Sequence, residues 1–456
     1  MKKYLFVMLC CCASLARAQV PDKEFIDIYR ELIEIDTAQP EANTTPAARA
    51  MAKRLLDAGF DPRDVEIAGP APDRQNLIAR LRGAGEGKPI LLLAHIDVVA
   101  AHKEDWTGGL DPFKLTERDG YYYARGSIDD KAMASIFVAN MIRMKREGFR
   151  PKRDIVLALT ADEESGNRNG VEWLIRNRRD AIDAQVALNE GAGGSWRHGK
   201  PFIQGVQVAE KVYHTFDFEL TGPGGHSSVP GRDNVIYDMA AALSRLSELQ
   251  LPAHVDDAAK RFFAAVAPTE TGSLAAALEA VARGEYTDAQ LKELSASPRL
   301  NAQLRTTCVA TRIEGGHADN ALPQRVHATV NCRIFPGEKS SFVEAELKRV
   351  AGDRIRVRPR GEEHPSGPMD INSPFMKTIE RVSETMWPGT PVVPIMGTGA
   401  TDGAKLRNAG IPVYGVSGIF LEYGENRLHG QDERVPVKSL LDSREFLYRL
   451  ARALAS

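Results

Sequence analysis

The 456-residue chain lacks several features that would place it in particular classes of protein. Neither sign of charge is in excess, since 59 Lys and Arg balance 61 Asp and Glu to a net charge of −2. No strong field therefore favours binding to nucleic acid or to an anionic membrane. Beyond the N-terminus, no apolar run approaches the roughly twenty residues of a membrane-spanning helix. The apolar (43%) and charged (26%) fractions are ordinary and exclude a disordered or collagen-like chain.

Cysteines are also few, and three of the five lie within the first twelve residues. The other two, Cys308 and Cys332, lie on predicted strands of a hairpin that turns near Asn320. In an oxidising compartment they could form a disulfide. The alternative is two buried thiols that act as small hydrophobes. The thiols are slightly favoured, because directly opposed strand residues suit disulfide geometry poorly.

The N-terminus has the pattern of a cleavable signal peptide. Lys2 and Lys3 precede an apolar run over residues 4–15, and Ala16-Arg17-Ala18 offers a small-x-small cleavage site. A buried N-terminal helix is the minor alternative. We therefore expect a signal peptide over residues 1–18 and a periplasmic or secreted mature protein.

The remaining sequence predicts an α/β fold. Apolar runs over residues 89–94 and 155–160 read as strands buried on both faces, and they alternate with helical segments. From about residue 209 the order strand–helix–strand–strand–helix–strand resembles a split βαβ motif, with a helical insertion over 252–300. We expect a catalytic domain with a mostly parallel sheet, formed by residues 19–208 and 363–456. An α+β, ferredoxin-like domain over 209–362 is inserted into it.

Several catalytic signatures are missing, namely HExxH, GxSxG, a Walker loop and CxxC. Acids and histidines instead follow predicted strands or precede a helix. They are His95 and Asp97, Asp129 and Asp130, Asp162-Glu163-Glu164, Glu190, and His429 in a later polar loop.

Each of these positions alone has an ordinary explanation as a solvated turn or a helix cap. Together they favour metal binding, because imidazole mixed with carboxylate suits zinc, with manganese or cobalt as relatives. Two histidines and at least three carboxylates exceed the needs of one tetrahedral ion. The sequence therefore predicts a two-metal site with a bridging carboxylate.

Six segments carry a resemblance to a known family. The sequence is similar to the M-twenty metallopeptidases, which include carboxypeptidase G, carboxypeptidase S, aminoacylase-1, succinyl-diaminopimelate desuccinylase and the carnosine dipeptidases. The match runs from about residue 25 to the C-terminus, and members related to carboxypeptidase S resemble the chain most. The segments are LLLAHIDVV (91–99), ARGSIDDK (124–131), ADEESG (161–166), NEGAG (189–193), GPGGHSS (222–228) and LHG (428–430).

The resemblance implies a role for each predicted site residue. One zinc ion would be held by His95, Asp129 and Glu190, and the other by Asp129, Glu164 and His429. Asp97 would orient His95, and Glu163 would be the general base. The Asp129–Asp130 peptide would be cis.

The inserted domain resembles the family's lid and dimerisation domain. His226 would then stabilise the oxyanion in the active site of the partner subunit of a homodimer. Asn320, Arg333, Gly399 and Thr401 lie at positions that bind substrate in relatives, although a structural ion pair is nearly as good an explanation for Arg333. Glycine often follows the DDK segment in relatives, whereas Ala132 stands there in this chain.

The resemblance thus implies a zinc-dependent hydrolase that releases a C-terminal amino acid from a peptide or an N-acyl amino acid. The nearest alternative is a deacylase like aminoacylase or the desuccinylase. The other alternative is a catalytically silent binding protein of the same fold, which the complete set of predicted ligands and base argues against.

Overall fold

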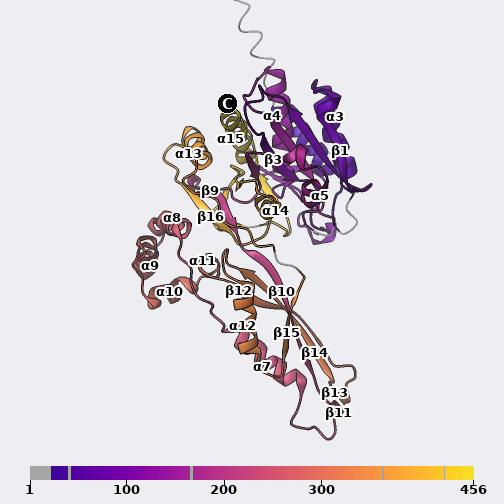
Figure 1. The fold of residues 1–456 in the computed structure, drawn as a ribbon, viewed down its shortest axis with the longest axis vertical. Helices are drawn as coiled ribbons and strands as arrows, with labels where there is room; N and C mark the ends of the chain where they lie inside the picture. The colour runs from indigo at the N-terminus through magenta and orange to yellow at the C-terminus, as the bar shows by residue number, and fades with distance from the viewer. Residues whose placement is uncertain (1–21, 40–42, 165–167, 362–363, 426) are drawn as a thin grey trace, which may run out of the picture. The chain divides into compact units, whose positions relative to one another are not determined.

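The computed structural model describes residues 22–456 apart from 40–42, 165–167, 362–363 and 426. The predicted signal peptide lies outside the described residues. Among the helices described, none combines the length and the apolar character needed to cross a membrane. The chain forms two compact units, one of residues up to 207, 369–393 and 401–456, and the other of residues 208–368 and 394–400 (Figure 1).

A ten-stranded sheet forms the framework of the first unit, although the last residues of β9 and most of β16 belong to the second. Its strands run in the order β1-β2-β6-β3-β7-β17-β9-β8-β18, and β16 also pairs with β9. The neighbours β6, β3, β7 and β17 are mutually parallel, while β1 and β2 are antiparallel. The strands are β1 (Val65–Ala71), β2 (Arg74–Leu81), β3 (Ile90–His95), β6 (Ile155–Thr160), β7 (Val186–Asn189), β8 (Gly194–Arg197), β9 (Lys200–Glu210), β16 (Val392–Gly397), β17 (Val413–Gly415) and β18 (Phe420–Glu422).

The central strands β3 and β6 are buried along their whole length, as continuous apolar runs require when helices cover both faces of a sheet. The predicted α/β class is confirmed, although the sheet is mixed at its edges. The helices of this unit are α2 (Asp22–Glu34), α3 (Thr45–Asp57), α4 (Lys131–Arg146), α5 (Gly170–Asn177), α6 (Arg179–Ile182), α13 (Pro374–Met386), α14 (Asp402–Asn408) and α15 (Val437–Ala455). A small sheet contains β4 (Thr116–Arg118), β5 (Tyr121–Tyr123) and β19 (Arg434–Pro436).

The second unit is built on a four-stranded antiparallel sheet in the order β12-β14-β10-β15. Apolar residues of this sheet pack with those of α7 and α12 in one core. With its insertion set aside, the unit has the order β10-α7-β12-β14-α12-β15 that a split βαβ motif requires. The elements are β10 (Val212–Thr221), β11 (Gly225–His226), α7 (Val235–Ser247), β12 (Thr307–Gly315), β13 (Ala321–Leu322), β14 (Arg325–Ile334), α12 (Ser340–Ala351) and β15 (Arg356–Arg360).

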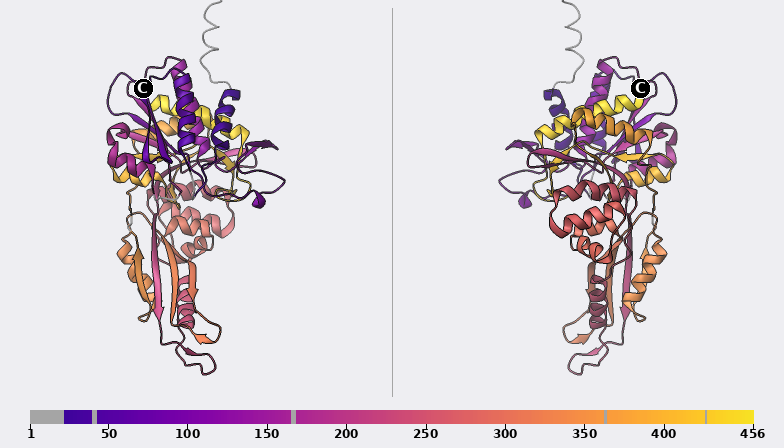
Figure 2. Two further views of the ribbon diagram at one scale, coloured as in Figure 1. Left: turned by 90° about the vertical axis from the view of Figure 1, so that its right-hand side faces the viewer. Right: turned by 90° about the vertical axis from the view of Figure 1, so that its left-hand side faces the viewer.

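Four further helices interrupt this unit where the sequence predicts a helical insertion. In Figure 2 they gather at the end of the four-stranded sheet opposite the β11–β13 ribbon. They are α8 (Asp257–Val266), α9 (Gly272–Arg283), α10 (Asp288–Ser295) and α11 (Pro298–Leu304).

The two remaining cysteines form a disulfide, so the preference for free thiols is wrong. Cys308 on β12 lies directly opposite Cys332 on β14, as the hairpin predicts. Their Cα atoms are 4.1 Å apart, similar to the closely spaced pairs of an antiparallel ladder. At that spacing the two sulfurs come within bonding reach, which the sequence-based argument from opposed strand residues overlooked.

Candidate metal centre

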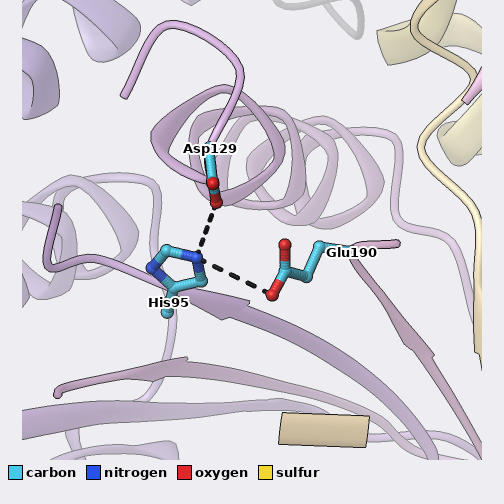
Figure 3. Close-up of side chains that lie close together, drawn as sticks. All are labelled: His95, Asp129 and Glu190. Atoms are coloured by element: carbon cyan, nitrogen blue, oxygen red, sulfur yellow. Dashed lines mark hydrogen bonds and ion pairs between the residues drawn. The ribbon is translucent and has the colours of Figure 1, made fainter. Parts of the chain in front are cut away.

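The first group of candidate ligands comes from neighbouring strands of the large sheet. His95 ends β3, Glu190 follows β7, and Asp129 lies just before α4. Because β3 and β7 are parallel neighbours, their carboxyl ends lie side by side. The Nε2 atom of His95 is 3.0 Å from Asp129 Oδ1 and 3.8 Å from Glu190 Oε1 (Figure 3).

The second group shares Asp129 with the first. The Nε2 atom of His429 is 3.0 Å from Asp129 Oδ2 and 3.1 Å from Glu164 Oε1. Glu164 follows β6, which lies beside β3 in the sheet. Asp129 therefore presents one carboxylate oxygen to each group, as a bridging ligand between two ions must.

Both groups fit a divalent transition metal. In each, one ligand atom from every residue lies within 4.8 Å of the others. Ligands bound tetrahedrally to zinc lie about 3.4 Å apart, close to the separations observed here. The mixture of imidazole nitrogen and carboxylate oxygen also suits zinc, cobalt or manganese.

The electrostatics of the two groups favour a bound cation. Hydrogen bonds to Asp129 and Glu164 raise the pKa of the His429 imidazole to about 10. Burial, followed by the neighbouring Asp129 carboxylate, raises the pKa of Glu190 well above its ordinary value. Carboxylates are thus crowded where little water can screen them, and a cation between them would relieve the repulsion.

The backbone around the ligands is unusual. The Asp129–Asp130 peptide bond is cis, as the family resemblance implies. Asp162 and His429 have φ of 62° and 61°, in the left-handed region that residues other than glycine seldom adopt. One precedes the Glu163–Glu164 pair and the other is itself a candidate ligand. Such conformations cluster at functional sites, where surrounding contacts hold them.

Asp97 contacts His95, as the sequence predicts, and it also contacts the backbone of Glu163 and Glu164. Its backbone carbonyl, rather than its carboxylate, lies 3.0 Å from His95 Nδ1, while Oδ1 is 3.8 Å away. The carboxylate instead accepts the backbone N–H groups of Glu163 and Glu164, each at 3.1 Å. Gln39 Nε2 donates to the same carboxylate and to Asp162. Asp97 therefore anchors both the histidine and the paired glutamates.

Glu163, the predicted base, is partly buried beside Glu164. Its pKa lies well above the ordinary value for glutamate. Burial is the main cause, and the carboxylates of Asp402 and Glu164 add to it, whereas His95 and Lys405 act in the opposite direction. A raised pKa makes a carboxylate a better proton acceptor, which is the property that a general base needs.

The predicted substrate-binding residues are divided between the units. Thr401 belongs to the first, where it caps α14 and accepts a 3.4 Å hydrogen bond from Asn189, the neighbour of Glu190. Asn320, Arg333 and Gly399 belong to the second, as does His226, the predicted oxyanion-stabilising residue. The metal-ligand geometry rests on first-unit residues alone, so the roles of these four stay predictions.

Two of the second-unit residues have informative surroundings. The guanidinium of Arg333 lies over the ring of Tyr213 at 4.7 Å, and among the described residues it forms no ion pair with a carboxylate. His226 is exposed, and its Nδ1 accepts the backbone N–H of Ser228 at 3.1 Å. With Nδ1 acting as an acceptor, a neutral His226 carries its proton on Nε2.

Three residues around the centre escaped sequence reasoning. They are Gln39, which bridges Asp97 and Asp162, and the buried ion pair of Arg125 with Glu433. The Asp432-Glu433 pair soon after His429 was the available signal, since two acids near a candidate ligand suggest a supporting role.

Comparison with known proteins identifies the family. Residues 91–453 match the model for peptidase family M20/M25/M40, which is most of the chain. The chain belongs to this family. The region matched contains every candidate ligand described above.

Two curated relatives and one solved structure illustrate the range of the M20/M25/M40 family. The chain is 27% identical over 362 residues to the N-fatty-acyl-amino acid synthase/hydrolase PM20D1 of Xenopus tropicalis (77% of this chain, 70% of that one). It is 29% identical over 395 residues to probable carboxypeptidase S-like 2 of Dictyostelium discoideum (83% and 74%). The fold resembles that of the metallo-carboxypeptidase Sso-CP2 of Sulfolobus solfataricus, with a TM-score of 0.70, 17% identity and coverage of 94% and 98%.

Family membership settles the reaction class. The protein is a metal-dependent amide hydrolase of the M20/M25/M40 peptidases, as the sequence predicts.

Proposed function

We propose that the protein releases a C-terminal amino acid from N-acyl amino acids or peptides, with two zinc ions bound at the candidate centre. The observation that carries this proposal is the sharing of Asp129 between two ligand groups. His95 and Glu190 would complete one site, and Glu164 and His429 the other. Cobalt or manganese are the alternative metals, since the same ligands suit them.

The bound ions would polarise the scissile carbonyl and lower the pKa of a water molecule. Glu163 accepts a proton from the attacking water and later delivers it to the leaving amine nitrogen, so that the amide is cleaved to a carboxylate and an amine. Asp97 holds the Glu163 backbone during both transfers. The two glutamates thus divide the work: Glu164 binds a metal ion and Glu163 moves the proton.

A free carboxylate on the substrate is the feature shared by peptides and N-acyl amino acids. Arg333 has the chemistry to bind it, because its guanidinium stacks on Tyr213 and forms no ion pair with a described carboxylate. Asn320, Gly399 and Thr401 would provide further hydrogen bonds. N-acyl amino acids are the preferred class, since the PM20D1 relative is named for them.

His226 would stabilise the oxyanion of the tetrahedral intermediate. Its Nδ1 accepts a hydrogen bond from Ser228, which leaves Nε2–H as the donor that an oxyanion needs. In our proposal His226 serves the partner subunit of a homodimer formed through the second unit. The exposed edge strand β12, where Val309 and Ile313 are largely uncovered, supports such an assembly.

We further propose that the protein is exported to the periplasm or secreted after removal of residues 1–18. The Cys308–Cys332 disulfide supports this localisation, because disulfides persist mainly in oxidising compartments.

The test is release of free amino acid from a panel of N-acyl amino acids, dipeptides and C-terminally amidated dipeptides. Zinc-loaded wild type is compared with Glu163→Gln on every member. We expect release from N-acyl amino acids and unblocked dipeptides by the wild type alone. Equal release from the amidated dipeptides would overturn the carboxylate requirement, and no release from any member would favour the binding-protein alternative.

A further inference from the structure

Glu433 contacts the backbone of the candidate ligand Asp129 but is not itself a candidate ligand. It is fully buried, and its carboxylate accepts a hydrogen bond from Arg125 Nη1 at 2.7 Å. The same carboxylate accepts three backbone N–H groups, those of Gly126 at 3.2 Å, Ile128 at 2.8 Å and Asp129 at 3.3 Å. One side chain therefore organises the backbone segment that ends in the shared ligand.

Arg125 extends this contact to the other ligand-bearing loop. While Nη1 pairs with Glu433, Nη2 donates to the carbonyl oxygens of His429 at 3.3 Å and Gly430 at 3.1 Å. Two segments about 300 residues apart in the chain are thus joined through one buried ion pair. One segment contains Asp129 and the other contains His429, whose side chains meet at 3.0 Å.

We propose that Glu433 and Arg125 are positioning residues that set the separation between Asp129 and His429, and with it the affinity of the metal site that these two ligands share. The proposal rests on the proposed function for the identity of the ligands. It rests independently on the pattern of contacts, since the partners of the ion pair are the backbone groups of the two ligand segments. Groups that orient metal ligands commonly change metal affinity 10- to 100-fold when removed.

The contact pattern also indicates which substitutions are informative. Only N–H donors contact the Glu433 carboxylate in the described structure, so Glu433→Gln turns one acceptor oxygen into an NH₂ group that opposes them. Arg125→Lys keeps a positive charge for Glu433. It removes the planar fork that reaches Glu433 and the His429 carbonyl together.

Asp154→Asn provides a matched control. Asp154 also accepts from an arginine and from a backbone N–H, Arg80 at 2.8 Å and Gly83 at 2.8 Å. It lies just before β6, at the end of that strand remote from Glu164, roughly 20 Å along the strand. The control therefore removes a similar contact in the same unit without touching either ligand segment.

The experiment measures zinc stoichiometry by elemental analysis and both dissociation constants by chelator competition, with folding followed by circular dichroism. We expect Glu433→Gln to bind zinc about 10- to 100-fold more weakly and Asp154→Asn to bind it like the wild type. Arg125→Lys should weaken zinc binding only at the site formed by Asp129, Glu164 and His429. Equal affinities in Glu433→Gln and Asp154→Asn would overturn the proposal.

Two further results, a variant that does not fold and a wild type that does not hydrolyse, also have a defined meaning. If Glu433→Gln does not fold, Arg125→Lys carries the test, and unchanged affinity at both of its sites overturns the proposal. If the wild type binds zinc tightly but hydrolyses no panel substrate, the proposed function fails while the positioning result stands. If only the positioning proposal fails, the wild type still hydrolyses the panel substrates. The failure of this proposal can therefore be distinguished from the failure of the proposed function.

Discussion

The carboxylate of Asp97 accepts the backbone N–H of Glu163 at 3.1 Å. A second hydrogen bond of the same length joins its other oxygen to the backbone of Glu164. Because the Asp97 carbonyl also contacts His95, one residue anchors a candidate metal ligand on β3 and the two glutamates after β6. The position of Glu163, the proposed general base, therefore depends on Asp97 as directly as the orientation of the histidine does.

Asp97→Asn should impair proton transfer more than substrate binding. The asparagine NH₂ would face one of the two backbone N–H groups, leaving a buried donor unsatisfied. We expect kcat to fall about 10- to 100-fold with little change in KM. Steady-state kinetics at saturating zinc checks this expectation. A change confined to KM would instead assign Asp97 to substrate binding.

Glu163 and Glu164 should respond differently to the same chemical change. Glu163→Gln removes the proton acceptor but no ligand, so we expect both zinc ions to be retained and kcat to fall about 10²- to 10⁴-fold. Glu164→Gln weakens a ligand and should reduce the zinc content. Parallel metal analysis and kinetics separate the two roles. Loss of zinc in Glu163→Gln would contradict the assignment of Glu163 as the base and Glu164 as the ligand.

The disulfide should stabilise the second unit. It joins Cys308 to Cys332 across 24 residues of sequence, and closing a loop of that size stabilises a fold by about 3 kcal/mol. The double variant Cys308→Ser/Cys332→Ser should unfold at lower urea concentration by a corresponding amount. Titration of thiols in the unfolded, unreduced protein provides the control. Two free thiols there, or an unchanged unfolding midpoint, would contradict the expectation.

Lys211 should make stability depend on pH. Its side chain is buried and donates to the carbonyl of Arg305 at 2.7 Å. Burial, with a smaller contribution from Arg333, lowers its pKa from 10.5 to about 7. Between these values the unfolded chain binds a proton that the folded chain does not. The contribution of Lys211 to stability therefore rises with pH across this window, by at most about 1.4 kcal/mol per unit, and is constant below pH 7.

Urea unfolding at pH 7, 8 and 9 measures this effect. The difference in unfolding free energy between wild type and Lys211→Met should grow with pH in favour of the wild type. Lys339→Met, at an exposed position of the same unit, should show a constant difference. A constant difference for Lys211→Met as well would mean that its amine stays charged in the folded protein.

The sequence was sufficient for the class of fold and for the set of residues that meet at the centre. Continuous apolar runs identified β3 and β6 as buried strands, and strands of this kind bring their carboxyl ends to one edge of the sheet. That rule predicted that His95, Glu164 and Glu190 would be neighbours. The placement of Asp129 and His429 depended on the family resemblance, because neither follows such a strand.

Other features needed the structure. The contacts of Gln39 and Glu433 join segments that are distant in the chain, and local pattern does not reveal such partners. The left-handed conformation of Asp162 does not follow from the local sequence pattern. The bond between Cys308 and Cys332 needed the observed 4.1 Å separation of their Cα atoms, although the hairpin that places them opposite each other was predicted.

The order of the ligands along the chain affects when the centre can first form. His95, Asp129, Glu164 and Glu190 all precede the second unit, whereas His429 follows it close to the C-terminus. A chain still emerging from the ribosome therefore has one ligand group complete and the other lacking its histidine. Both ligand groups can be complete only once His429 has been made, so a product that ends before this residue has no assembled pair of candidate sites with which to cleave amides.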